Sequence, residues 1–179
     1  LPHHKLKNIQ VIRMNKGLSN NYLDSLMLNL PIHSYEGSFP CDQTPILSSL
    51  KQPSSLIINL DTSSLPGSHW VSIYHTKNLT LYFDSYGRNP NEELNKILKS
   101  GNKRVIYFNK RIQSFDSIFC GYFCVACIIS QEIGLSLNTF LNLFSHTEQI
   151  ENTSPATHSK LESNDKLVEL FIIEFIKNC

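Results

Sequence analysis

Long hydrophobic runs are absent from this sequence, and so is an excess of charge of one sign. The longest apolar stretches fall far short of the roughly 20 residues that a membrane-spanning helix needs, so we expect no contact with a membrane. No apolar leader region follows the opening LPHHKLKN, and we therefore expect no secretory signal. The formal net charge of +1 excludes a chain that binds nucleic acid through bulk charge.

A complete set of cysteine pairs is also lacking, because five cysteines are an odd number in 179 residues. A chain of this length buries roughly two-thirds of its unfolded surface as one domain, so it needs no disulfide framework. Repeats, low-complexity tracts and long linkers are missing as well. These absences predict one domain over residues 1–179 in a reducing, intracellular setting.

Helical periodicity marks several segments. LSNNYLDSLMLNLP has Ser19 as a helix N-cap and Pro31 as a stop. NPNEELNKILKSG carries Glu92 and Glu93 in its first turn and Gly101 after its end. The same spacing predicts three more helices, in CGYFCVACIISQEIG, SLNTFLNLF and SNDKLVELFIIEFIKN.

Strand-like segments stand between these helices, in SSLIINL, HWVSIYHT, LTLYFDSYG and KRVIYFN. The polar pair Lys77 and Asn78 separates the second from the third, so residues 70–84 are predicted to form a β-hairpin with a two-residue turn. Together the pattern predicts an α+β fold, with a small, mostly antiparallel sheet packed with helices.

Three of the five cysteines crowd into IQSFDSIFCGYFCVACIISQEIG, as Cys120, Cys124 and Cys127. Cys-x3-Cys-x2-Cys is also the iron-sulfur spacing of radical S-adenosylmethionine enzymes, but that motif lies in a loop near the start of a larger barrel. Here the segment is helical, too few residues follow it to build such a barrel, and no ligand at zinc spacing lies nearby. We expect no metal and two buried packing thiols at Cys124 and Cys127, with a cluster enzyme as the alternative.

Cys120 differs from its neighbours because it stands where the helix begins, directly before Gly121. The unpaired amides and the positive end of the helix dipole favour a thiolate there, which is a nucleophile. A nucleophilic cysteine also needs a base, a group that orients the base, and oxyanion donors. The hairpin register places His69 opposite Tyr86 and on the same face as Asp84, one diagonal step away. An imidazole and a carboxylate therefore meet at the open end of the hairpin.

GSHWVSIY, LYFDSYG and QSFDSIFCGYFC, in that order, resemble the adenovirus-type cysteine proteases, whose pattern is His-Trp, an acid, Gln, and then Cys-Gly-x-Phe. The same clan includes proteases that cut SUMO-like modifiers. IHSYEGSFPCD, SLIINLDTSSLPGSHW and NDKLVELFIIEF are similar to further segments, and the seven-residue step from Gln113 to Cys120 is nearer the adenovirus branch. The resemblance implies a papain-like arrangement with the catalytic cysteine at a helix N-terminus.

The resemblance also implies a catalytic role for four matching residues. Cys120 would attack the scissile carbonyl, His69 would protonate the leaving amine, and Asp84 would orient His69. The side-chain NH2 of Gln113 would serve the oxyanion hole together with the backbone N–H of Cys120.

Residues next to the nucleophile and the base bear on the substrate. Trp70 follows His69, and Gly121 and Phe123 follow Cys120. We expect Trp70 and Gly121 to border a narrow substrate cleft. Such a cleft favours cleavage after glycine, because a larger side chain would collide with its walls.

The activity implied by the resemblance is a cysteine endopeptidase that cleaves capsid or other structural precursor proteins at Gly-containing sites during virion maturation. The source would be an adenovirus-related or smaller DNA virus, such as a virophage or a virus-like transposon. The enzyme would act in the virion and at the intracellular assembly site of the host cell, cytoplasmic or nuclear. A protease that processes ubiquitin-like modifiers by SUMO-type deconjugation is one alternative, and an inactive binding module is another.

Activation is where the sequence departs from the adenovirus enzyme, which uses a peptide held by a disulfide to a cysteine shortly before its Gln. NKRVIYFNKRIQ contains no cysteine, so we expect no such tether and no cofactor for the chemistry. A peptide or DNA activator stays open as an alternative. DNA contact rests on one local basic patch, formed by Lys103, Arg104, Lys110 and Arg111.

Overall fold

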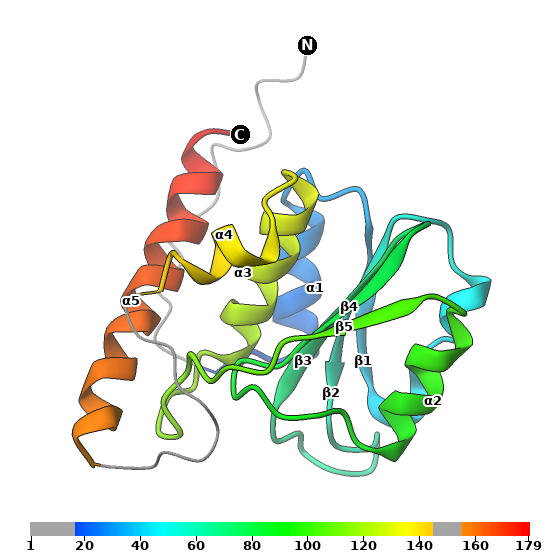
Figure 1. The fold of residues 1–179 in the computed structure, drawn as a ribbon, viewed down its shortest axis with the longest axis horizontal. Coiled ribbons are helices and arrows are strands. Elements are labelled where there is room, and N and C mark those ends of the chain that lie inside the picture. The colour runs from blue at the N-terminus through cyan, green and yellow to red at the C-terminus, as the bar shows by residue number, and fades with distance from the viewer. Residues whose placement is uncertain (1–16, 145–154) are drawn as a thin grey trace.

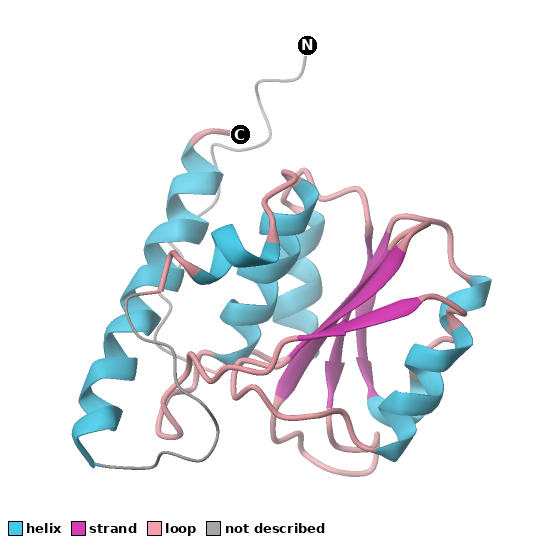
Figure 2. Ribbon diagram, in the orientation of Figure 1, coloured by secondary structure: helices cyan, strands magenta, loops and turns pink. Residues whose placement is uncertain are grey.

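A five-stranded sheet with helices on both faces forms the framework of the protein (Figures 1 and 2). The structure is a computed structural model that describes residues 17–144 and 155–179. The order of the strands in the sheet follows the chain. They are β1 (Tyr35–Pro40), β2 (Ser54–Asn59), β3 (Trp70–His75), β4 (Leu79–Phe83) and β5 (Arg104–Tyr107).

The three central strands pair antiparallel, and the predicted hairpin register is confirmed, with Ser72 opposite Phe83 and His75 opposite Thr80. Both edge strands pair parallel, β1 with β2 and β5 with β4. The α+β class is confirmed, but the prediction of a mostly antiparallel sheet is wrong at the two edges. Parallel neighbours need a crossover connection. Helix α2 (Glu92–Ser100) makes one, and a segment with two short 3-10 helices between β1 and β2 makes the other.

The remaining helices are α1 (Asn20–Leu28), α3 (Cys120–Glu132), α4 (Leu137–Leu141) and α5 (Pro155–Lys177). Helix α1 begins as predicted, because the Ser19 hydroxyl accepts a hydrogen bond from the backbone N–H of Tyr22. Helix α2 ends at Gly101 as predicted. Within the two described ranges, no helix combines the length and the apolar character that crossing a membrane requires.

The sheet buries a separate apolar layer on each face. Helices α1, α3, α4 and α5 cover one face, where Phe123 and Ile128 of α3 belong to the same apolar cluster as Phe83 of β4. Helix α2 and the 3-10 segment cover the other face through Leu94 and Leu47 (Figure 1). All six residues of β2 are therefore buried, the polar Ser54, Ser55 and Asn59 together with the apolar Leu56, Ile57 and Ile58. Helix α3 lies directly against β3, so its first residue comes close to the residues that flank the hairpin.

Candidate active site

His69 and Asp84 lie side by side at the open end of the β3–β4 hairpin. His69 directly precedes β3, and Asp84 directly follows β4. Nε2 of His69 lies 2.7 Å from Oδ1 of Asp84, and both side chains are buried. The same carboxylate oxygen accepts a hydrogen bond from the backbone N–H of Tyr86 at 2.8 Å. The turn after β4 therefore fixes the acid, and the acid fixes the imidazole.

Cys120 is the first residue of α3 and is half-buried. Its thiol lies within hydrogen-bonding reach of His69. Since Nε2 of His69 faces Asp84, Nδ1 is the ring nitrogen left for the sulfur. The structure thus brings Cys120, His69 and Asp84 together as the sequence predicted, with His69 between the thiol and the carboxylate.

The charge of His69 follows from these two contacts. Burial by itself lowers the pKa of His69, but the hydrogen bonds and charges of Asp84 and Cys120 outweigh it and raise the pKa to about 9. His69 therefore carries a proton on both nitrogens at neutral pH. An imidazolium beside a thiol at a helix N-terminus stabilises the thiolate, which is the reactive form of the cysteine.

An aromatic layer covers the imidazole. The Tyr86 ring stacks on His69 with centroids 4.4 Å apart and an angle of 18° between the planes. Phe115 packs against Tyr86 at 5.2 Å, and the guanidinium of Arg88 lies 4.8 Å from the Tyr86 centroid. A ring face over an imidazolium stabilises its charge and keeps water from the His69–Asp84 bond. Sequence reasoning used Tyr86 only for the register, and no sequence signal pointed to Phe115.

Gln113 is buried under the loop that leads to Cys120. Its side-chain carbonyl accepts a hydrogen bond from the Ser85 hydroxyl, and its NH2 donates to the backbone carbonyl of Ser117 at 2.8 Å. A longer contact of 3.3 Å joins the same NH2 to the Ser117 hydroxyl. These partners fix the amide so that its NH2, the donor end, faces the loop of the nucleophile.

The turn after β4 and the segment after β5 lie against each other. The backbone N–H groups of Ile112 and Gln113 both donate to the carbonyl of Ser85. Gly87 has a φ of +70°, and a Cβ at this position would lie 2.6 Å from the carbonyl carbon of Lys110. Only glycine permits both the backbone conformation and the close approach. This contact joins the turn that holds Asp84 to the segment that carries Gln113.

Helix α5 supports the same segment from the other side. The buried Asn164 donates a hydrogen bond from its side chain to the carbonyl of Ile112 at 2.9 Å. Asp165 lies within hydrogen-bonding reach of Ser117, and burial raises the pKa of Asp165 to about 6 although that contact lowers it. The loop before Cys120 is therefore held by the C-terminal helix as well as by the sheet.

The prediction of packing thiols at Cys124 and Cys127 is confirmed. Both side chains lie in the core between α3 and the sheet, and burial raises the pKa of both thiols. All five cysteines of the chain are free. Across residues 17–144 and 155–179, no group of three or more His, Cys, Asp or Glu residues is placed to hold a metal ion.

No protein-family profile matches the sequence, and no curated protein matches it. The fold does have a solved counterpart, the crystal structure of the ASFV pS273R protease. The two structures agree with a TM-score of 0.56 over 88% of this chain and 67% of the other, at 15% sequence identity. This chain has the fold of a protease. At this identity the likeness is one of architecture, and it reinforces the α+β, papain-like arrangement predicted from the sequence.

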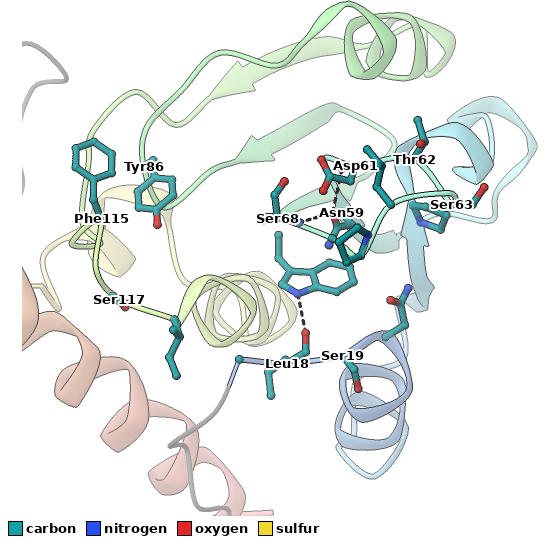
Figure 3. A pocket seen from close by; sticks show the side chains of 18 residues that line it. Leu18, Ser19, Asn59, Asp61, Thr62, Ser63, Ser68, Tyr86, Phe115 and Ser117 are labelled. Carbon is teal, nitrogen blue, oxygen red and sulfur yellow. Dashed lines mark hydrogen bonds between the residues drawn. The ribbon is translucent and has the colours of Figure 1, made fainter.

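A cleft of about 600 Å³ lies next to His69, because its lining includes Ser68 and Trp70 on either side of that residue (Figure 3). Trp70 lines it as predicted, and the Trp70 indole N–H donates to the carbonyl of Leu18 at 2.9 Å. Gly121 does not line it, contrary to the prediction. Gly121 is buried, and a Cβ there would lie 3.0 Å from the Leu18 side chain, so its small size serves the packing of Leu18 on α3.

The predicted basic patch is also smaller than expected. Lys103, Arg104 and Lys110 are exposed. Arg111 is only 2% exposed, and its guanidinium lies 4.4 Å from the centroid of the Phe115 ring. Arg111 therefore belongs to the layer beneath the site, because its charge is directed at an aromatic ring and not at the surface.

Proposed function

We propose that this protein is a cysteine endopeptidase. The observation that carries the proposal is the position of His69, which binds Asp84 through Nε2 and reaches Cys120 at the start of α3. The shared fold with a protease supports it. The arrangement supplies a nucleophile, a charged acid for the leaving group and an orienting carboxylate within one buried site.

In the first half of the reaction, the Cys120 thiolate attacks the scissile carbonyl carbon and the carbonyl π electrons move to the oxygen. The tetrahedral intermediate collapses, the carbon–nitrogen bond breaks, and Nδ1 of His69 gives its proton to the departing amine. In the second half, neutral His69 takes a proton from water, which attacks the thioester and releases the acid and the thiolate. Asp84 holds the ring in position throughout.

The negative oxygen of each intermediate needs donors. The backbone N–H of Cys120, in the first turn of α3, is one. The NH2 of Gln113 is the second, and its 3.3 Å contact with the Ser117 hydroxyl is the weaker of its two hydrogen bonds. An oxyanion would replace this longer contact while the 2.8 Å bond to the Ser117 carbonyl keeps the amide in place.

For the substrate, we propose capsid or other structural precursor proteins, cut after glycine during virion maturation at the assembly site of the host cell. The ordered motifs of the adenovirus-type proteases support this choice, and so does the likeness in fold to an ASFV protease. We expect the chemistry to use only side-chain and backbone groups of this chain and no cofactor. Lys103, Arg104 and Lys110 are the exposed cations through which DNA would act on the enzyme.

Co-expression with candidate precursor proteins, followed by mass mapping of new termini, tests this function. We expect cuts after glycine in exposed, extended segments, none with Cys120→Ala, and none after the glycine before the cut is changed to valine. Equal cleavage after valine would overturn the narrow-cleft argument. Cleavage of ubiquitin-like fusions, with capsid precursors left intact, would favour the modifier-processing alternative.

A further inference from the structure

The two ends of the cleft differ in chemistry (Figure 3). Aromatic side chains of Tyr86 and Phe115 mark one end, beside the loop that leads to the nucleophile. Asn59, Asp61 and Ser63, together with the hydroxyl of Thr62, mark the other. A substrate that lies along the cleft therefore meets apolar rings near one end and polar groups at the other.

Among the described residues that line the cleft, Asp61 is the one carboxylate, and none is a lysine, arginine or histidine. The Asp61 side chain is partly exposed. Within the described residues, the polar end of the cleft therefore offers an acidic side chain with no basic side chain in its lining.

Hydrogen bonds fix the backbone around Asp61, whereas its carboxylate has no hydrogen bond or ion pair among the described residues. The Asp61 N–H donates to the side-chain carbonyl of Asn59 at 3.0 Å, and the Asp61 carbonyl accepts from the N–H of Cys41 at 3.2 Å. Within the part of the chain that the structure describes, no hydrogen bond or ion pair engages the Asp61 carboxylate. A carboxylate on a rigid backbone loses little entropy when it meets a cation.

Asp42, on the same loop system, shows the opposite arrangement. Its two carboxylate oxygens accept from the backbone N–H and the hydroxyl of Ser63, each at 2.8 Å. These hydrogen bonds lower the pKa of Asp42 and tie down the wall of the cleft. Asp42 therefore serves the structure of the loop, and Asp61 is left to face whatever enters.

We infer that Asp61 selects a lysine or arginine side chain of the substrate, at the position that binds over the polar end of the cleft. The inference rests on the proposed function, because it takes this cleft as the substrate site of a peptidase. A basic side chain would pair with the carboxylate and donate to the neighbouring Asn59 and Ser63 oxygens, while an acidic one would be repelled.

A positional library of internally quenched peptides with a fixed glycine before the cut tests the inference. We expect one position at which wild-type enzyme prefers lysine or arginine over glutamate by about three- to tenfold in kcat/KM, the range of a partly exposed ion pair. Asp61→Asn should flatten this preference, and Asp61→Lys should invert it. The preference should also shrink between 50 mM and 500 mM salt, about the range over which screening removes such an interaction.

Glu93→Lys on α2, outside the cleft, is the matched change of charge and should leave the preference unaltered. Binding of the same peptides to Cys120→Ala, followed by fluorescence anisotropy, separates this inference from the peptidase proposal. Tighter binding of the lysine peptide that Asp61→Asn abolishes supports the inference even without turnover. Active enzyme that cuts lysine and glutamate peptides equally, or an unchanged preference in Asp61→Asn, would overturn it and leave the peptidase standing.

Discussion

Cys120 and Cys124 lie one helical turn apart on α3, in two different surroundings. Cys120 is half-buried at the first position of the helix, within reach of the His69 imidazolium. Cys124 is fully buried, and burial raises the pKa of its thiol well above the usual value. We propose the first thiol as the nucleophile, whereas the second is an apolar core residue. The distance of each thiol from a charge and from the helix end sets its expected reactivity, because the residue type is the same.

Removing each thiol in turn gives the largest expected difference between the two positions. Cys120→Ala should abolish turnover, while Cys124→Ala and Cys127→Ala should keep most of it and lose about 1 kcal/mol or more of folding free energy through the cavities they leave. Peptide cleavage and denaturant unfolding measure the two effects. If a folded Cys124→Ala or Cys127→Ala protein were as inactive as Cys120→Ala, one nucleophile would not suffice to explain the site.

The imidazolium next to Cys120 is the second point at which the comparison can be broken. His69→Ala should leave a folded protein with almost no turnover. In wild-type enzyme, kcat/KM should fall as pH rises through about 9, where His69 loses its proton. Asp84→Asn should lower the rate and move this basic limb toward lower pH, because the carboxylate that raises the pKa of His69 is gone. If the basic limb stayed at the same pH in Asp84→Asn, Asp84 would not be the group that raises the pKa of His69.

Gln113 tests the oxyanion hole, with a smaller expected effect. Gln113→Ala should reduce kcat by roughly 10²-fold, the scale for one lost oxyanion donor, with little change in KM. Ser85→Ala removes only the hydroxyl that orients the Gln113 amide, so it should cost less. Single-turnover kinetics on a slow peptide substrate provide the measurement, and an unchanged rate in Gln113→Ala would remove this residue from the mechanism.

The smallest expected effect is on stability. The pKa of His69 is raised on folding, so its contribution is complete below about pH 6.5 and is lost as pH rises through about 9. The free energy of unfolding should therefore decline across this interval, and should decline less in Asp84→Asn. Urea unfolding of the wild-type and Asp84→Asn proteins at several pH values provides the test. An identical decline in both proteins would assign it to other groups.

The catalytic alignment could be predicted from the sequence because it depends on local rules. A two-residue turn sets the hairpin register, and that register places His69 next to Asp84. Helix periodicity in CGYFCVACIISQEIG predicts α3, which begins at Cys120. These signals come from residues that are close together in the sequence, so the sequence alone is enough to predict them.

Features that depend on distant contacts could not be predicted. The parallel pairing of β1 and β5 follows from crossover connections, which strand patterns alone do not reveal. Arg111 has the sequence context of a surface cation, but it is buried and its guanidinium lies against the ring of Phe115. On α5, the apolar spacing does not reveal which face is buried, since Leu170 is exposed while Val168 and Ile172 are buried. This helix has apolar residues on more than one face, and only packing selects among them.

The contacts of Leu18 set a limit on how the chain can be trimmed. The Leu18 carbonyl is the acceptor for the buried Trp70 indole, and the Leu18 side chain rests on Gly121 directly after the nucleophile. A shortened protein that starts beyond Leu18 would leave the indole N–H without its acceptor and expose the first turn of α3. We expect such a protein to be inactive even if its sheet and helices form, so a shortened version must retain Leu18.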